Sequence, residues 1–475
     1  MSFRTSSAAL VSLATLLVGA APLLAQPTLA AALRQADNAG FSNRVANGET
    51  AARSAQSIAA LKGILPTLRF EAGYARTTDP INAFGTLLRQ RAITAADFDP
   101  ARLNYPAPIS NYQGGIVLEQ PIFNGDAWAG RSAAAAGTAA SRASEEWTRL
   151  STRVDVIRAY YGAVLAAERA RTLRAASGAA HAHEKEAAAM ARQGVVTESD
   201  ALLASVRAGS VDADLADATG NVAMARGQFA VAIGNPDPNS ASVVSLPDSL
   251  PSADRIRAVV AGDTAQVAPA AAATRADVRA AARGLDAARI DAVRARTTFL
   301  PRINAVGRYD WNSPDRLYSG ERSWTVGVMA TWTPFAGGGQ LSDVEASRAR
   351  ANSARAQADG AAANARLQLA ATRIALVVAL QRLDIAERGA VQSATAHRIV
   401  ARKYGGGLAT IAELLDAQAT ETQSALSLSQ ARYATIVAAA ERLRATGEDP
   451  AALTALDAPE SFADAGNAPS TSLPR

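Results

Sequence analysis

The sequence predicts a mixed α and β fold that is built twice, with long antiparallel helices and four strands in each chain. An internal repeat, long proline-free stretches and four segments of period two support this prediction. Pro121 and Pro334 are 213 residues apart (334 − 121), and the same offset relates Gly194 to Gly407 without a gap. A repeat of this length indicates a duplicated domain rather than a solenoid unit.

The first copy is longer than the second between two anchor points. Leu65-Pro66 returns as Leu300-Pro301 at an offset of 235, so the first copy contains 22 additional residues (235 − 213) before Pro121. The composition agrees with long helices, because the chain is poor in aromatic residues at 5%. Its net charge of +5 comes from arginines scattered among acids. Without a basic stripe that alternates with aromatic residues, we expect no nucleic-acid partner.

The N-terminal segment has the pattern of a secretory signal peptide. Arg4 precedes an apolar run from Ala8 to Leu24, so we expect residues 1–25 to be removed after Ala25. No later stretch has the length of a membrane-spanning helix, and any membrane-embedded part must therefore consist of strands. The chain has no cysteine, which excludes a lipidated N-terminal cysteine and disulfides. The expected destination is the periplasm or the outer membrane.

We assign residues 26–235 to the first repeat. A helix is expected from Ala30 to Ile64, followed by a β-hairpin at about 66–121 in which apolar and polar residues alternate. Its two strands are separated by residues 76–111, which contain four prolines and are predicted to form a long external loop. A helical hairpin over 126–234 completes the repeat, since Ile122 to Asn235 contains no proline.

The second repeat, 273–447, follows a connection at 236–272. It is expected to contain a helix to Phe299, a β-hairpin at about 301–334 and a helical hairpin over 339–446, and residues 448–475 are expected to form a flexible tail. In the last strand Trp324 and Trp332 are eight residues apart on the apolar face. This separation is about 26 Å in a strand and suits the two aromatic girdles of an outer-membrane barrel.

Two readings of the strands remain open at this point. Amphipathic hairpins also occur in soluble β-sandwiches, which are the alternative to a barrel. Four strands cannot close a barrel, and lipid does not tolerate an open sheet edge, so a barrel would have to be shared between copies. The long helices support packing of a coiled-coil type, because apolar residues recur at spacings of three and four at Trp147, Leu150, Val154, Ile157, Tyr161 and Val164.

Several motifs resemble the TolC-type outer-membrane efflux proteins over nearly the whole chain. They are Leu65-Pro66 and Leu300-Pro301 before the strands, 120–125 and 334–338 after them, and above all 404–417 with Ala431-Arg432-Tyr433. The resemblance implies a homotrimer with a twelve-stranded β-barrel in the outer-membrane lipid and an α-helical coiled-coil tunnel in the periplasm. It also implies two partners, a periplasmic adaptor (membrane fusion) protein and an inner-membrane pump.

The expected function is that of a passive exit duct for small toxic compounds or drugs in a tripartite efflux system. One alternative is an outer-membrane channel for type I polypeptide secretion. A second, from another class, is a soluble periplasmic coiled-coil adaptor or scaffold. The chain is not expected to be an enzyme or to hold a cofactor or metal: it has no nucleophile elbow or phosphate loop, and His181 and His183 are two residues apart on a helix and face different ways.

Candidate site residues follow the glycines that end the long helices. Asp200 and Glu413 lie three residues after Thr197 and Thr410, where the acid of a helix capping box belongs. Capping does not account for Asp416, one turn further on. In a trimer Glu413 and Asp416 would form two carboxylate rings, whose mutual repulsion should raise their pKa values and which should favour cations.

The resemblance assigns roles to these positions. Glu413 and Asp416 match an acidic pair at the closed periplasmic entrance, and Asp200 and Tyr404 match members of its latch, whereas Ala409 replaces the latch arginine. The turns, Gly194-Val195-Val196 and Gly407-Leu408-Ala409, match the tips that adaptors contact. An exposed apolar residue beside a glycine suits a partner site, although the glycines can equally be simple helix C-caps.

Overall fold

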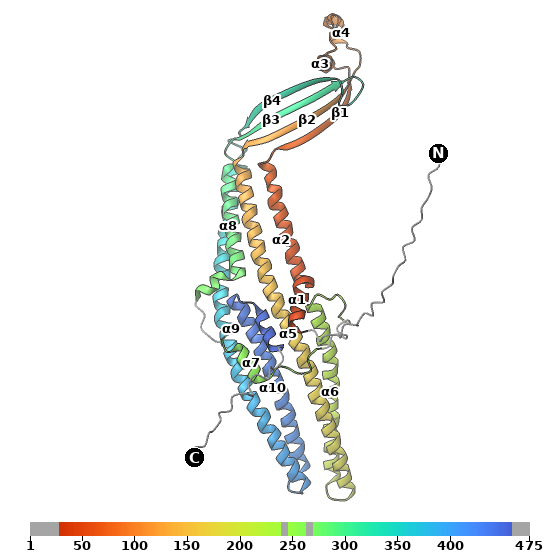
Figure 1. The fold of residues 1–475 in the computed structure, drawn as a ribbon, viewed down its shortest axis with the longest axis vertical. Coiled ribbons are helices and arrows are strands. Elements are labelled where there is room, and N and C mark those ends of the chain that lie inside the picture. The colour runs from red at the N-terminus through yellow and green to blue at the C-terminus, as the bar shows by residue number, and fades with distance from the viewer. Residues whose placement is uncertain (1–27, 239–245, 263–268, 458–475) are drawn as a thin grey trace, which may run out of the picture.

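The protein is elongated, with a four-stranded sheet at one end and four long helices at the other (Figure 1). The computed structural model describes residues 28–238, 246–262 and 269–457. The expected signal peptide, 1–25, lies outside these residues. Two similar halves, each with two strands followed by two long helices, confirm the duplicated mixed α and β fold.

The four strands form one antiparallel sheet in the order β1 (Thr67–Thr77), β2 (Ile109–Phe123), β3 (Arg302–Ser313) and β4 (Glu321–Thr331). The two repeats meet at β2 and β3, which pair antiparallel. Within the described chain β1 and β4 are edge strands, each with a neighbour on one side only. The sheet therefore ends on both sides in backbone groups that another strand could pair with.

Four long helices form two helical hairpins that carry the fold away from the sheet. Hairpin 1 consists of α5 (Gly125–Arg192) and α6 (Glu198–Ala232), and hairpin 2 of α9 (Gly339–Gly405) and α10 (Ile411–Thr446). Helices α5 and α9 run unbroken from the sheet to the far end (Figure 1). Near the sheet, α2 (Phe41–Ala59) packs against α5, and α8 (Ala276–Thr297) packs against both α5 and α9.

The first helical segment is broken where the sequence predicted one helix from Ala30 to Ile64. Helix α1 (Leu29–Ala39) ends at Gly40, α2 then begins, and a short 3₁₀ helix, η1 (Ala60–Gly63), precedes β1. The backbone of Gly40 is so close to the carbonyl oxygen of Ala36 that a Cβ atom there would lie 2.4 Å from it. The side chain of Asn43 donates a hydrogen bond to the same carbonyl and stabilises the break.

The 22-residue excess of the first repeat contains helices, although the sequence predicted a long external loop. Helix α3 (Pro80–Arg89), the 3₁₀ helix η2 (Ala95–Phe98) and α4 (Pro100–Asn104) lie between β1 and β2. Proline is favourable at the first position of a helix, where its missing N–H has no partner to lose. Pro80 and Pro100 therefore begin helices, and Asp79 and Asp99 cap them.

The hydrophobic core lies at mid-height, where both hairpins meet α1, α7 (Ala253–Val260) and the C-terminal 3₁₀ helix η5 (Pro450–Asp457). The sequence predicted a flexible tail from residue 448. Residues 450–457 instead pack on the core, because Leu453 and Leu456 are buried there. The rest of the tail lies outside the described residues. The connection at 236–272 contains α7 and the first residues of η4 (Pro269–Thr274).

A carboxylate fixes this C-terminal segment to the core. Asp457 accepts hydrogen bonds from the hydroxyls of Tyr160 and Tyr161, both at 2.9 Å, and from the backbone N–H of Leu29 at 2.8 Å. Burial raises the pKa of both tyrosines, and the negative charge of Asp457 adds to the effect. The hydroxyls therefore stay protonated and act as donors, which connects α1, α5 and η5 through one side chain.

Candidate functional site

The sheet has one apolar and one charged face. Phe70, Ile116, Tyr309 and Trp324 stand in one row across the four strands on the apolar face. Large apolar side chains of this face are exposed: Leu68, Phe70, Tyr74, Leu118, Trp324, Val326 and Val328. A contiguous exposed apolar face marks a surface that contacts lipid or another protein.

Charged residues on the opposite face pair with one another. Arg308 lies 2.8 Å from Asp310 and 3.0 Å from Glu71. Arg69 lies 3.9 Å from Glu119, which accepts a hydrogen bond from Asn304 at 2.9 Å. This face therefore carries paired charges, whereas the other is apolar and exposed.

The two tryptophans singled out in the sequence lie at opposite ends of β4. Trp324 is within the strand and Trp332 one residue beyond its end, and both are exposed. The indole N–H of Trp332 donates a hydrogen bond to the carbonyl oxygen of Phe299 at 3.0 Å, at the base of the sheet. The sheet thus carries a tryptophan near each end of its apolar face.

The turns that close the two hairpins have the same backbone. Gly194 and Gly407 have φ angles of 72° and 73°, in the left-handed region that favours glycine. After each glycine an N–H bonds back into the preceding helix, from Val195 to Met190 at 2.9 Å and from Leu408 to Lys403 at 2.8 Å. Each turn glycine directly follows the C-cap residue of its helix, at the position where a left-handed glycine commonly ends a helix. The following side chains are nevertheless exposed, by 67% at Val195 and 82% at Leu408.

Capping boxes begin both helices that follow the turns. The carboxylate of Asp200 accepts from the backbone N–H of Thr197 at 3.1 Å, and that of Glu413 from the N–H of Thr410 at 2.7 Å. The hydrogen bond from the backbone N–H of Thr410, the bond from its hydroxyl and the charge of Lys403 lower the pKa of Glu413 within one chain. The rise in pKa expected from repulsion in carboxylate rings depends on the trimer and stays a prediction. Asp416 is exposed one turn further along α10.

An apolar cluster joins the two hairpins just above the turns, and we refer to it as the junction cluster. Its buried members are Ala187, Ala204, Tyr404, Ile411, Leu414 and Leu415, with Met190, Val400, Ala401 and Ala409 packed against them. The hydroxyl of Tyr404 donates to the sulfur of Met190 at 3.5 Å, not to Asp200. The structure therefore does not pair the two expected latch residues within one chain, and Ala409 contributes to an apolar contact where a latch arginine was expected.

Three buried residues of this cluster were not among the site residues predicted from the sequence. Ile411, Leu414 and Leu415 recur at spacings of three and one on the buried face of α10, beside the acids that the motif brought forward. The spacing of apolar residues was therefore visible, but it does not reveal that this face meets a helix more than 200 residues earlier in the chain. That contact depends on the arrangement of the two hairpins.

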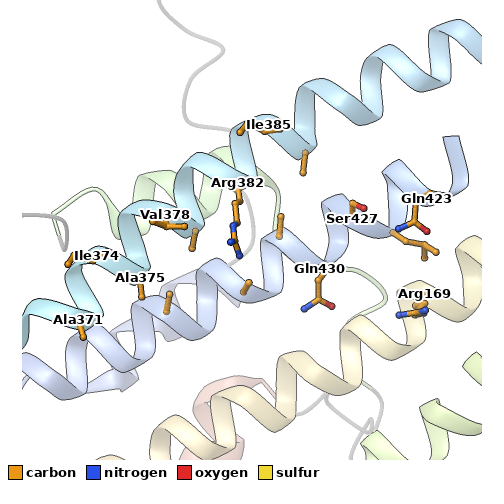
Figure 2. A pocket seen from close by; sticks show the side chains of 16 residues that line it. Arg169, Ala371, Ile374, Ala375, Val378, Arg382, Ile385, Gln423, Ser427 and Gln430 are labelled. Carbon is orange, nitrogen blue, oxygen red and sulfur yellow. The ribbon is translucent and has the colours of Figure 1, made fainter. Parts of the chain in front are cut away.

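A groove runs along hairpin 2 beside α5 (Figure 2). It has a volume of about 1080 Å³ and is lined on α9 by Ile374, Val378 and Ile385, and Arg169 and Arg382 also line it. Ile374 and Ile385 are more than half exposed. Such a groove along a long helix is suited to contact with a further helix.

None of the described helices is both long enough and apolar enough to cross a membrane. The fold combines an amphipathic open sheet with two long helical hairpins. The sequence profile of the outer membrane efflux protein family matches residues 42–235 and 267–448. The chain belongs to this family of outer membrane efflux proteins, and the two matched ranges correspond to its two repeats.

Solved structures share the fold at low sequence identity. The CmeC outer membrane channel of Campylobacter jejuni is 18% identical, with 88% of this chain and 85% of CmeC covered at a TM-score of 0.75. The outer membrane protein VceC of Vibrio cholerae is 18% identical, with 89% of this chain and 96% of VceC covered at a TM-score of 0.73. The MtrE outer membrane channel of Neisseria gonorrhoeae is 21% identical, with 89% of this chain and 90% of MtrE covered at a TM-score of 0.70. No curated protein sequence matches the chain.

Proposed function

We propose that three copies of this chain form an outer-membrane exit duct, which passively conducts small toxic compounds delivered by an inner-membrane pump through a periplasmic adaptor. The observation that carries the proposal is the sheet, with two edge strands and an exposed apolar face. Three such sheets supply the twelve strands of a closed barrel. The apolar faces then contact lipid, Trp324 and Trp332 lie at its two interfaces, and the charged faces line the lumen.

The order of the helices supports the same assembly. Contacts run from α6 to α5, from α5 to α10 and from α10 to α9, so α6 and α9 are the outer helices of this row. Both have exposed apolar residues, among them Leu202 and Val206 on α6 and Ile374 and Ile385 on α9. When α9 of one copy packs against α6 of the next, this head-to-tail contact closes a ring and continues the helical wall below the barrel.

The turns form the inner end of the duct in this proposal. Val195 and Leu408 supply the exposed apolar contact to the adaptor, together with Gly194, Val196, Gly407 and Ala409. Glu413 and Asp416 form the acidic constriction at the entrance. Tyr404 contributes to the contact that keeps the hairpins together, and Asp200 supports it because its carboxylate accepts the backbone N–H of Thr197 at the start of α6. The junction cluster holds the two hairpins together in place of the absent latch arginine.

Two substitutions on adjacent residues of β4 test the barrel. Val326 lies on the apolar face and Thr325 on the charged face, opposite Arg308. We expect Val326→Asp to place a carboxylate in lipid and to prevent stable trimers, whereas Thr325→Asp, the matched control, is tolerated. The parent chain in mild detergent should have the mass of a trimer and conduct ions in bilayers. A stable folded monomer, or extraction from cells without detergent, would overturn the proposal.

A further inference from the structure

All three histidines of the chain lie in one band of the helical hairpins, between the core and the junction cluster. His181 and His183 are on α5 and His397 is on α9. From His183 to the end of α5 at Arg192 the helix rises about 14 Å, so the band lies just above the proposed entrance. The three side chains make different contacts, and only two of them lie between the hairpins.

His181 connects the helices of hairpin 1 to each other. Its Nδ1 lies 2.9 Å from Glu184 and its Nε2 2.8 Å from Asp212 on α6. Because a carboxylate only accepts, both ring nitrogens carry a proton and the imidazole is cationic. The hydrogen bond with Glu184, followed by that with Asp212, raises the pKa of His181. The charge of His181 is therefore held by the two carboxylates of hairpin 1 and takes no part in the contact between the hairpins.

His183 faces the other hairpin. Its ring lies edge to face with that of His397 on α9, with centroids 6.4 Å apart. Both side chains are more than four-fifths buried. Nδ1 of His397 bonds to Glu421 on α10, whereas its Nε2 is buried and has no hydrogen-bond partner among the described residues. The pair is thus a closely packed, partly unsatisfied polar contact between α5 and hairpin 2.

We propose that His183 and His397 form a pH-responsive contact between the two hairpins, and that its protonation in mildly acidic medium favours their separation above the entrance. The inference rests on the proposed function for its meaning, because separation there widens the entrance of a duct. The packing itself supplies the reason. Two imidazolium rings at this distance repel each other, and a buried ring lacks the hydration that stabilises its charged form in water.

The direction of the effect follows from linkage. Burial lowers the pKa of His183 first, and the neighbouring His397 lowers it further, against the opposing charge of Glu186. When the hairpins separate, His183 is hydrated and its pKa returns toward 6.5. Protonation therefore favours the separated state, and for each pH unit between the two pKa values the ratio of separated to joined hairpins changes about tenfold.

The charged groups that face the pair come from two helices, α5 and α10. Glu186 on α5 lies 3.9 Å from His183, and Glu421 on α10 bonds to His397, so two carboxylates moderate the repulsion. Glu186 and Asp200 also lie near the neutral hydroxyl of Tyr404.

Distance measurements between the hairpins test the inference without any transport assay. The chain has no cysteine, so Arg192→Cys on α5 and Arg402→Cys on α9 provide two unique, exposed sites for spin labels. Trimers that contain mostly unlabelled copies isolate the distance within one chain. From about pH 7.5 to about pH 5.5 we expect a new, longer distance to appear. This shift should be lost in His183→Gln and retained in His181→Gln, the matched control.

Further variants keep the test decisive. His397→Gln should also lose the shift, and His183→Arg, which carries a fixed charge, should show the longer distance already at neutral pH. A parent chain with the same distances at both pH values, or a full shift in both glutamine variants of the pair, would refute the proposal. Conductance of the same trimers in bilayers is independent: a distance shift without conductance contradicts the exit duct and leaves the pH-responsive contact intact.

Discussion

Replacing Asp457 by alanine should release α1 and η5 from the core. The hydroxyls of Tyr160 and Tyr161 are almost fully buried and would both lose their acceptor, and the N–H of Leu29 would lose its partner as well. Each buried donor left unsatisfied costs about 1 to 3 kcal/mol. The two hydroxyls alone give about 4 kcal/mol, which corresponds to a local opening equilibrium about 10³ times larger.

Hydrogen exchange of the α1 amides, followed by mass spectrometry, measures this opening. Exchange in α1 should accelerate strongly in Asp457→Ala, whereas the amides of α10 near Glu413 keep their rates. Asp457→Asn retains one acceptor oxygen and should have an intermediate effect. Asp359→Ala on the exposed side of α9 is the control for loss of a carboxylate. Unchanged exchange of α1 in Asp457→Ala would show that Asp457 does not hold these segments together.

The remaining predictions concern the turns, the acids and alkaline pH. Val195→Asp combined with Leu408→Asp should leave the trimer intact and abolish crosslinking to the adaptor, because a charge in a desolvated contact costs about 2 to 5 kcal/mol. Continued crosslinking and export would show that the adaptor binds elsewhere. Glu413→Ala combined with Asp416→Ala should weaken cation selectivity in bilayer recordings. Asp200→Ala should retain the selectivity and lose about 1 kcal/mol of helix stability through the missing cap. Unchanged selectivity of the double variant would show that the two acids do not select cations. Above about pH 10 the hydrogen exchange of the α1 amides should accelerate. An unfolded tyrosine ionises there, whereas the raised pKa values of Tyr160 and Tyr161 keep both hydroxyls protonated in the fold, so stability falls as pH rises. An exchange rate that follows only the intrinsic pH dependence of amide exchange would contradict this.

The architecture was predictable because it rests on local patterns. Alternation of apolar and polar residues predicts the strands, and the proline-free stretches and the turn glycines predict the long helices, which begin and end within a few residues of the expected positions. The 213-residue offset relates the two halves. These signals depend on neighbours in sequence, and periodicity within one element is enough to detect them.

Contacts between distant segments were not predictable in the same way. Asp457 lies in a stretch rich in Pro, Ser and Asp, and only its position beside Tyr160 and Tyr161 explains why residues 450–457 are ordered on the core. Gly40 stands at the break between α1 and α2, where its close approach to Ala36 leaves no room for a side chain, and composition does not reveal this contact. His183 and His397 are more than 200 residues apart, and their contact arises only once the two hairpins pack together.

The unbroken length of α5 gives it the mechanics of a lever. Its middle, at Tyr160 and Tyr161, is held in the core, and the segment from there to Arg192 extends about 47 Å without a break. A rotation of about 5° at this fulcrum displaces the far end by about 4 Å, which is larger than the diameter of a water molecule. Small changes in core packing are therefore amplified into larger displacements at the turns. Conversely, a small force applied at the turns exerts a large torque on α5 where it passes through the core.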